Sequence, residues 1–250
     1  MRIKFEEQLE KLNIMLMEMG ELCEEAINYA VKALNAENGD GEMLRRLTYE
    51  AERTIDDLER EIEGHCMKLL LQQQPVARDL RLVSAALKMI SDMERIGDQA
   101  LDIAEITEFV KLPGTSEKLC DGTQSGTVER NNCDLCRNHI DIMTETATEM
   151  VTKSIRSFVE KDLGMAGEVI AMDDIADSTF ELIKDDLINA LVADRVVDSA
   201  ASDKAADGLP DRKSGEFFVD ILMIAKYLER ISDHAVNIAE WVIFSVEGKH

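Results

Sequence analysis

Aromatic residues and prolines are scarce in this sequence. Only 4% of its 250 residues are Phe, Trp or Tyr, and only three are Pro. β-Sheet proteins usually carry more aromatic and β-branched residues, whereas Pro interrupts helices. The abundant Leu, Ala, Met and Glu are good helix formers. The composition therefore favours an all-α fold and argues against a sheet protein.

Basic residues are too few for nucleic-acid binding. The chain has 28 Lys and Arg against 51 Asp and Glu, which gives a formal net charge of −23. Phosphate backbones need a basic surface, and no Lys/Arg cluster suggests one. We therefore expect no nucleic-acid partner, and cations or basic protein surfaces instead.

The sequence also lacks apolar segments that would target it to a membrane. Its start, MRIKFEEQLEKL, places acids where a signal peptide needs an apolar run. No stretch approaches the roughly 18 apolar residues of a membrane span. We therefore expect a cytoplasmic protein, whose five Cys are free or metal-bound rather than disulfide-bonded.

What the sequence does contain is helical periodicity. Apolar residues recur at steps of three and four, the spacing of amphipathic helices. The expected helices cover about residues 5–36, 42–74, 76–111, 131–158, 165–192 and 216–246. Residues 113–130 are typical of a linker, and residues 193–215 of a long polar loop.

One acidic phrase occurs in both halves of the chain. Residues 94–105 read ERIGDQALDIAE and residues 229–240 read ERISDHAVNIAE, with eight of twelve letters identical. The other expected helices also correspond, at offsets of 124 and 121 residues. We therefore expect two tandem three-helix bundles related by internal pseudo-symmetry. The first covers 1–112, and the second, after the linker, covers 131–250.

The phrase places a row of acidic side chains beside the apolar stripe of its helix, since positions four apart share a face. The middle helix of each half adds two carboxylates. The first strip is Glu52, Asp56, Glu94, Asp98 and Asp102, and the second strip is Asp173, Asp177, Glu229, Asp233 and Asn237. Like charges four residues apart on a helix repel. Hard or borderline cations would neutralise such all-oxygen sites, among them iron(III), manganese, magnesium and calcium.

Two other interpretations of the strips stay open. The strips could be solvated acidic faces of a metal-independent helical adaptor, or the phrase could serve helix packing, with small Gly97 and Ser232 at close contacts. A ferritin-like oxidase is disfavoured, because that class needs Glu-x-x-His motifs on inward faces. Only Glu247 and His250 have this spacing, at the end of the chain.

The linker region brings together three cysteines and a histidine. Cys133 and Cys136 form a C-x-x-C pair, with Cys120 before it and His139 after it. A Cys₃His set could hold zinc or an iron–sulfur cluster. Free thiols at a helix start are the alternative. Cys23 and Cys66 are predicted to be helix-core residues.

Three stretches strongly resemble the PhoU family of bacteria and archaea. They are residues 15–34, residues 72–105, which contain the first acidic phrase, and residues 228–242, which contain the second. The resemblance covers nearly the whole chain outside the two polar segments. It implies a fold of two three-helix bundles and a non-enzymatic role, the repression of phosphate uptake and of the phosphate-starvation response.

The resemblance also implies ligands and partners. Family members bind multinuclear metal clusters, of iron or zinc and by some accounts magnesium or manganese, which here would fall on the two strips. Their partners are the ATPase of the phosphate importer and, where present, a sensor histidine kinase, so the protein would associate peripherally with the membrane. Many members form homodimers. Asn237 replaces the acid that Asp102 supplies in the first half, so the second site should be weaker or hold fewer ions.

Overall fold

The structure is a computed structural model that describes residues 2–36, 39–73, 75, 77–110, 126–201 and 212–248. Within these ranges it describes no side chains for residues 2–4, 73, 126–136, 193–201 and 212–214. The described chain forms helices and no strand. The six helices are α1 (Arg2–Leu34), α2 (Asp40–Gln73), α3 (Arg78–Ile106), α4 (Gly126–Glu160), α5 (Leu163–Ala201) and α6 (Arg212–Glu247). The predicted all-α class is confirmed.

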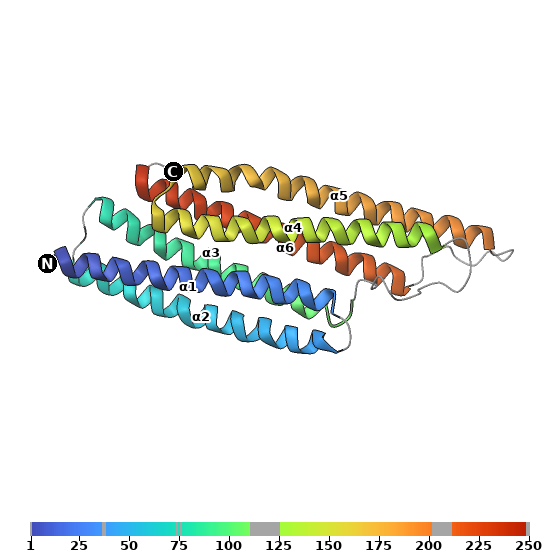
Figure 1. The fold of residues 1–250 in the computed structure, drawn as a ribbon, viewed down its shortest axis with the longest axis horizontal. Helices are drawn as coiled ribbons and strands as arrows, with labels where there is room; N and C mark the ends of the chain where they lie inside the picture. Colours follow the sequence, from blue (N-terminus) through green and yellow to red (C-terminus); the bar gives the residue numbers. More distant parts are fainter. Residues whose placement is uncertain are drawn as a thin grey trace.

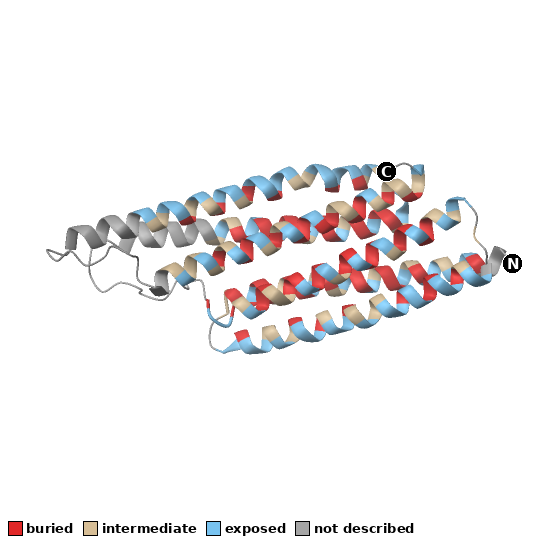
Figure 2. Ribbon diagram, turned by 180° about the vertical axis from the view of Figure 1, so that it is seen from behind, coloured by how far each residue is buried: buried red, intermediate tan, exposed pale blue. Residues whose placement is uncertain are grey.

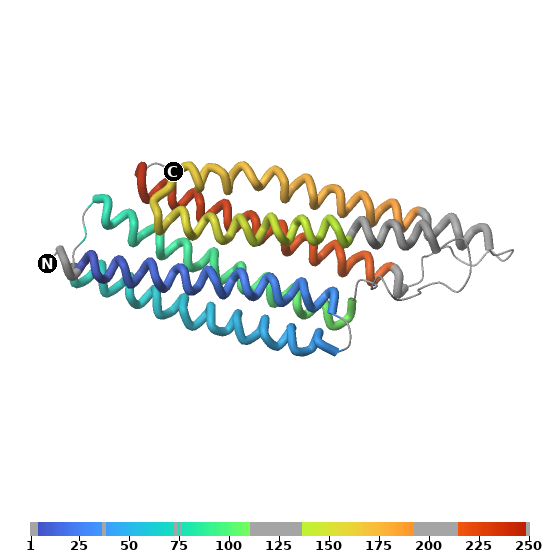
Figure 3. The backbone as a smooth tube through the Cα atoms, viewed as in Figure 1, coloured from blue at the N-terminus to red at the C-terminus, as the bar shows by residue number. Residues whose placement is uncertain are grey.

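The helices form two three-helix bundles that lie side by side along their length (Figure 1). Helices α1, α2 and α3 contact one another, as do α4, α5 and α6. The two bundles meet through α3 against α6 and α1 against α4. Within the described chain, α2 and α5 contact only helices of their own bundle, so they form the outer edges of the molecule (Figure 3).

Several predicted helix ends differ from those observed, among them the end of α3, which lies at Ile106 rather than near residue 111. Helix α4 begins at Gly126, inside the expected linker, and α5 continues to Ala201, inside the expected polar loop. Residues 193–201 contain neither Gly nor Pro. Nothing in that stretch therefore breaks a helix. The predicted turn between α4 and α5 is present, where Asp162 Oδ1 accepts bonds from the backbone N–H groups of Gly164 at 2.8 Å and Met165 at 3.1 Å.

The core is one continuous cluster of aliphatic side chains to which all six helices contribute. Buried residues concentrate along the facing sides of the bundles (Figure 2). The predicted core cysteines, Cys23 and Cys66, are fully buried. Burial raises the thiol pKa of each to about 12, so neither is a reactive thiolate at neutral pH.

Glycines permit two close helix approaches. A Cβ added at Gly97 of α3 would lie 3.1 Å from Ile55 Cδ1 of α2. One at Gly20 of α1 would lie 2.6 Å from Ile155 Cδ1 of α4. Gly97 belongs to the acidic phrase, so one face of the phrase packs against α2. Its carboxylates occupy the flank of that face, where α3 adjoins α2.

Candidate functional site

The first strip brings carboxylates of α2 and α3 close together. Burial raises the pKa of Glu52, and the charges of Asp56 on its own helix and Asp98 on α3 raise it further. The pKa of Asp98 is likewise raised, first by burial and then by Asp56 and Asp102. These shifts require mutual proximity, because carboxylate repulsion falls quickly with distance in a solvated site. The structure therefore unites the two helices' acids as the sequence predicted.

Glu59 of α2 belongs to the same cluster and was missed by sequence reasoning. The pKa of Glu94 is raised by burial, by Asp98 and then by Glu59. The Ser91 hydroxyl of α3 donates to Glu59 Oε1 at 3.4 Å, which places Glu59 across the seam from α3. Glu59 follows Asp56 by three residues and so shares its face. That signal was hidden among the many other acids of α2.

One member of the first strip already has a cationic partner. Arg60 donates to Asp56 Oδ2 at 3.0 Å and to Asp57 Oδ1 at 2.8 Å. The Arg60 side chain is mostly exposed, so water screens these bonds and a cation with higher charge can displace them. Asp56 therefore remains available to a metal ion.

The second strip has the most perturbed carboxyl group in the described chain. Burial and the charges of Asp177, Asp233, Asp174 and Glu229 raise the pKa of Asp173 to about 6. Its Oδ1 atom is buried and has no hydrogen-bond partner. Buried carboxylate oxygens normally accept hydrogen bonds or bind cations. A bound cation would satisfy this oxygen.

The second strip differs from the first by an internal cation. Lys226 of α6 forms an ion pair with Glu229, and its ammonium nitrogen lies 5.3 Å from the centroid of the Phe180 ring of α5. At the offsets of 135 and 121 residues, the first half has Ser91 for Lys226 and Glu59 for Phe180. At these two positions the first half therefore has an acid in place of an apolar ring and a neutral hydroxyl in place of a base.

Asp102 and Asn237 lie where the two bundles meet. The Asn237 amide donates to Asp92 Oδ1 at 3.2 Å, and His234 Nδ1 lies 2.9 Å from the same oxygen. Tyr227 of α6 is hydrogen-bonded to Asp102 of α3. Asp92 and Tyr227 occupy equivalent positions, so these contacts are pseudo-symmetric. The last residue of each strip thus also links α3 to α6.

The donor set of both strips fits a hard cation. Each supplies carboxylate oxygens from two adjacent helices, and such groups are the usual ligands of magnesium, manganese and iron(III). Among the described side chains, no three His, Cys, Asp or Glu groups converge on one point. The long side chains at the rim would close on an ion by changing rotamer.

Most of the predicted linker site lies outside the described residues. This applies to Cys120 and to the side chains of Cys133 and Cys136. His139 is described, and its Nδ1 lies 2.8 Å from Asp186 Oδ2 of α5. His65 and His234 are buried between helices, and His65 Nε2 lies 2.9 Å from the Gln8 carbonyl oxygen.

The PhoU domain model matches this chain twice, at residues 16–107 and 140–242. The chain belongs to the PhoU family. The two matches coincide with the two bundles, and the resemblance noted in the sequence is confirmed.

Two curated relatives match over more than nine-tenths of their lengths. A phosphate-specific transport system accessory protein PhoU homolog of Clostridium acetobutylicum is 29% identical over 98% of this chain and 95% of its own. One of Synechocystis is 32% identical over 99% and 93%. The crystal structure of PhoU from Pseudomonas aeruginosa superposes with a TM-score of 0.73 at 28% identity, covering 98% of this chain and all of that one. PhoU from Streptococcus pneumoniae, 20% identical, has the same fold with a TM-score of 0.73.

A transmembrane segment is not found among the described helices, since none combines the length and apolar character that crossing a bilayer requires.

Proposed function

We propose that this PhoU-family protein is a metal-binding, non-enzymatic regulator of phosphate uptake and of the phosphate-starvation response. The observation that carries the metal part is the second strip, where Asp173 holds a buried, unpartnered oxygen among four other carboxylates. The regulatory part is supported by relatives named as accessory proteins of phosphate-specific transport. The protein would act in the cytoplasm and reach the membrane only through its partners.

Iron or zinc is the proposed metal, with magnesium or manganese as alternatives. In the first half, Glu52, Asp56, Glu94 and Asp98 would supply oxygen ligands, with Glu59 as an additional one. In the second half Asp173, Asp177, Glu229 and Asp233 would do so. A bound cation would neutralise carboxylates that otherwise repel one another and would hold α2 on α3 and α5 on α6.

The two strips are proposed to bind metal unequally. Asn237 was the sequence-based reason to expect a weaker second site. The ion pair between Lys226 and Glu229 is a stronger reason, because the ammonium occupies a carboxylate that a metal would need. Phe180 further replaces a potential ligand with an apolar ring. We therefore assign the tighter site to the first strip.

The regulated partners are proposed to be the importer's ATPase and a sensor kinase, with homodimerisation also expected from the family. Metal removal would expose uncompensated negative charge on the docking surface and change electrostatic complementarity with a partner. A metal-independent adaptor is the competing function, supported by the Arg60 bonds that already compensate part of the first strip.

Metal analysis of protein purified without chelator, combined with a binding titration against the ATPase, tests the proposal. We expect more than one ion per chain, and weaker ATPase binding after metal removal. Disruption of the first strip should weaken that binding more than disruption of the second. Equal ATPase affinities in the metal-free and loaded states would favour the adaptor.

A further inference from the structure

Helix α5 exposes a row of large aliphatic side chains along its length. Its exposed large apolar side chains are Ile170, Ile175, Leu182, Ile188 and Val192. At the two central positions, 175 and 182, the equivalent residues of α2 are Thr54 and Glu61. The pseudo-symmetric fold therefore accepts polar residues at these two places, and the apolar ones are not needed for packing.

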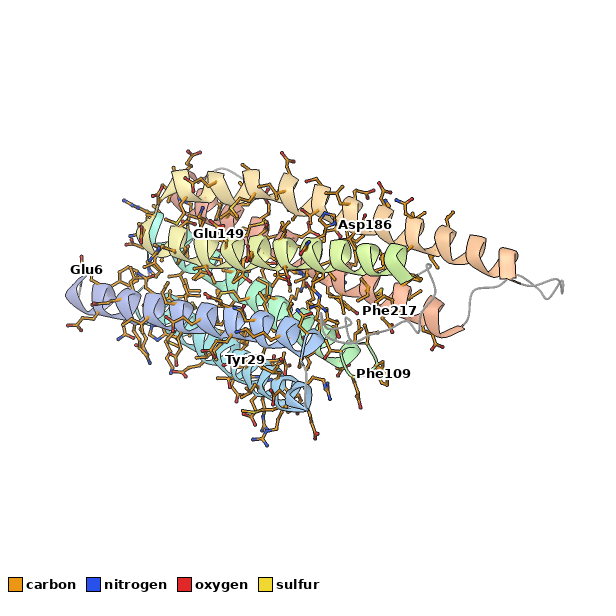
Figure 4. The ribbon with its side chains drawn as sticks, turned by 45° about the vertical axis from the view of Figure 1, so that its right-hand side comes forward. Glu6, Tyr29, Phe109, Glu149, Asp186 and Phe217 are labelled. Carbon is orange, nitrogen blue, oxygen red and sulfur yellow. The ribbon has the colours of Figure 1, made fainter. Side chains whose placement is uncertain are left out.

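Two side-chain contacts set the register of α4 against α5. His139 Nδ1 lies 2.8 Å from Asp186 Oδ2, and Lys153 Nζ lies 3.2 Å from Glu168 Oε2. The helices run antiparallel, so a residue three positions after His139 lies level with a residue about three or four positions before Asp186. Ile142 of α4 is therefore level with Leu182 of α5. Figure 4 shows Glu149 and Asp186 along this seam.

Three half-exposed aliphatic side chains consequently gather along one side of the seam. Ile142 is 45% exposed, Ile175 48% and Leu182 49%. We call them the α4–α5 patch. Small, buried Thr146 and Thr179 lie in the seam beneath them and let the two helices approach closely. The three side chains form an exposed apolar surface, and no described residue covers it.

The surroundings of the patch are strongly acidic. Exposed carboxylates flank it on both helices, namely Glu145, Glu149, Asp174, Glu181 and Asp185. The nearby bases are already engaged, because Lys153 pairs with Glu149 and Glu168 and Lys184 pairs with Glu181. A partner that covers the patch must therefore bring its own positive charge.

We propose that the α4–α5 patch docks an amphipathic helix of a partner protein whose apolar residues are flanked by Lys or Arg. Ile175 and Leu182 are two turns apart, or about 10.5 Å, which matches apolar anchors at positions i and i+7 of an aligned helix. A second copy of the same face would place acids against acids, and anionic lipid would be repelled in the same way. The inference does not depend on metal, because the second strip faces α6 and the patch faces α4.

A fluorescent peptide of about 20 residues, built from Leu and Lys with the Leu on one helical stripe, is a suitable probe. Anisotropy titrations should show one site per chain. The I175T/L182E variant, which installs the residue types of α2, should bind at least about tenfold more weakly. The control M67E/L71T makes similar changes at two exposed sites of α2 and should bind like the wild type. Circular dichroism should give the same helix content for all three proteins.

Several outcomes would overturn the proposal. Equal affinities for the wild type and I175T/L182E would place the peptide elsewhere. Equal binding of a peptide with the same composition but evenly dispersed Leu would reduce the interaction to charge attraction. Loss of a wild-type homodimer in I175T/L182E, seen by analytical ultracentrifugation, would identify the occupant as a second copy of this chain.

Discussion

Replacing Lys226 with Met should convert the weaker strip into a stronger metal site. The ammonium of Lys226 is bound to Glu229, and its side chain is about half exposed while that of Glu229 is mostly buried. Methionine keeps an unbranched apolar chain beside the Phe180 ring but removes the charge. Glu229 would then be free to bind a metal ion together with Asp173 and Asp233.

The magnitude follows from Coulomb's law. Two unit charges about 4 Å apart interact by about 1 kcal/mol in a water-like medium, so a divalent ion beside the ammonium would be repelled by about 2 kcal/mol. Competition for Glu229 adds the strength of an exposed ion pair, at most about 1 kcal/mol. An ion farther from the ammonium would experience less repulsion. Because about 1.4 kcal/mol corresponds to tenfold in affinity, we expect roughly tenfold tighter binding.

Isothermal titration calorimetry with Mn²⁺ on E94Q/D98N protein, in which the first strip is disabled, isolates the second site. K226M should lower its Kd by about tenfold. The matched control is K184M, which removes the same charge from a lysine that pairs with exposed Glu181. An unchanged Kd in K226M would refute the role assigned to Lys226. An equal gain in K184M would show that only the net charge matters.

Three further outcomes are expected. In otherwise wild-type protein, E94Q/D98N should lower the number of bound metal ions measured by mass spectrometry, and unchanged content would remove the first strip from the metal site. The pKa of Asp173 is raised to about 6 in the folded chain against about 3.9 unfolded, so the metal-free protein should lose stability as pH rises between these values. D173N should therefore raise the Tm by about 2–4 °C at pH 7, which corresponds to about 1 kcal/mol after allowance for partial exposure, and hardly at all at pH 4. An equal gain at both pH values would contradict the assignment. Chelation should expose three thiols, those of Cys120, Cys133 and Cys136, while buried Cys23 and Cys66 stay unlabelled; three reactive thiols before chelation would mean that the linker cysteines are free.

The sequence by itself determined the local structure and the duplication. The 3.6-residue period is a property of one helix, so apolar spacing was enough to find six helices and to place Cys23 and Cys66 in the core. The repeated phrase put its acids on one flank whatever the neighbouring helix was. Helix ends were less certain, because residues 193–201 form part of α5 without an apolar stripe or a cap to mark them.

The tertiary structure alone decided which side chains meet. Asp92 and His234 are 142 positions apart and come into contact only because α3 packs against α6. The same packing places Asp92 beside the amide of Asn237. Lys226 is three residues before Glu229, but whether it faces the second strip depends on the rotation of α6 against α5 and Phe180. Periodicity identifies the buried face of a helix, whereas the register between helices, set by contacts such as Gly97 on Ile55, determines which charges are compensated.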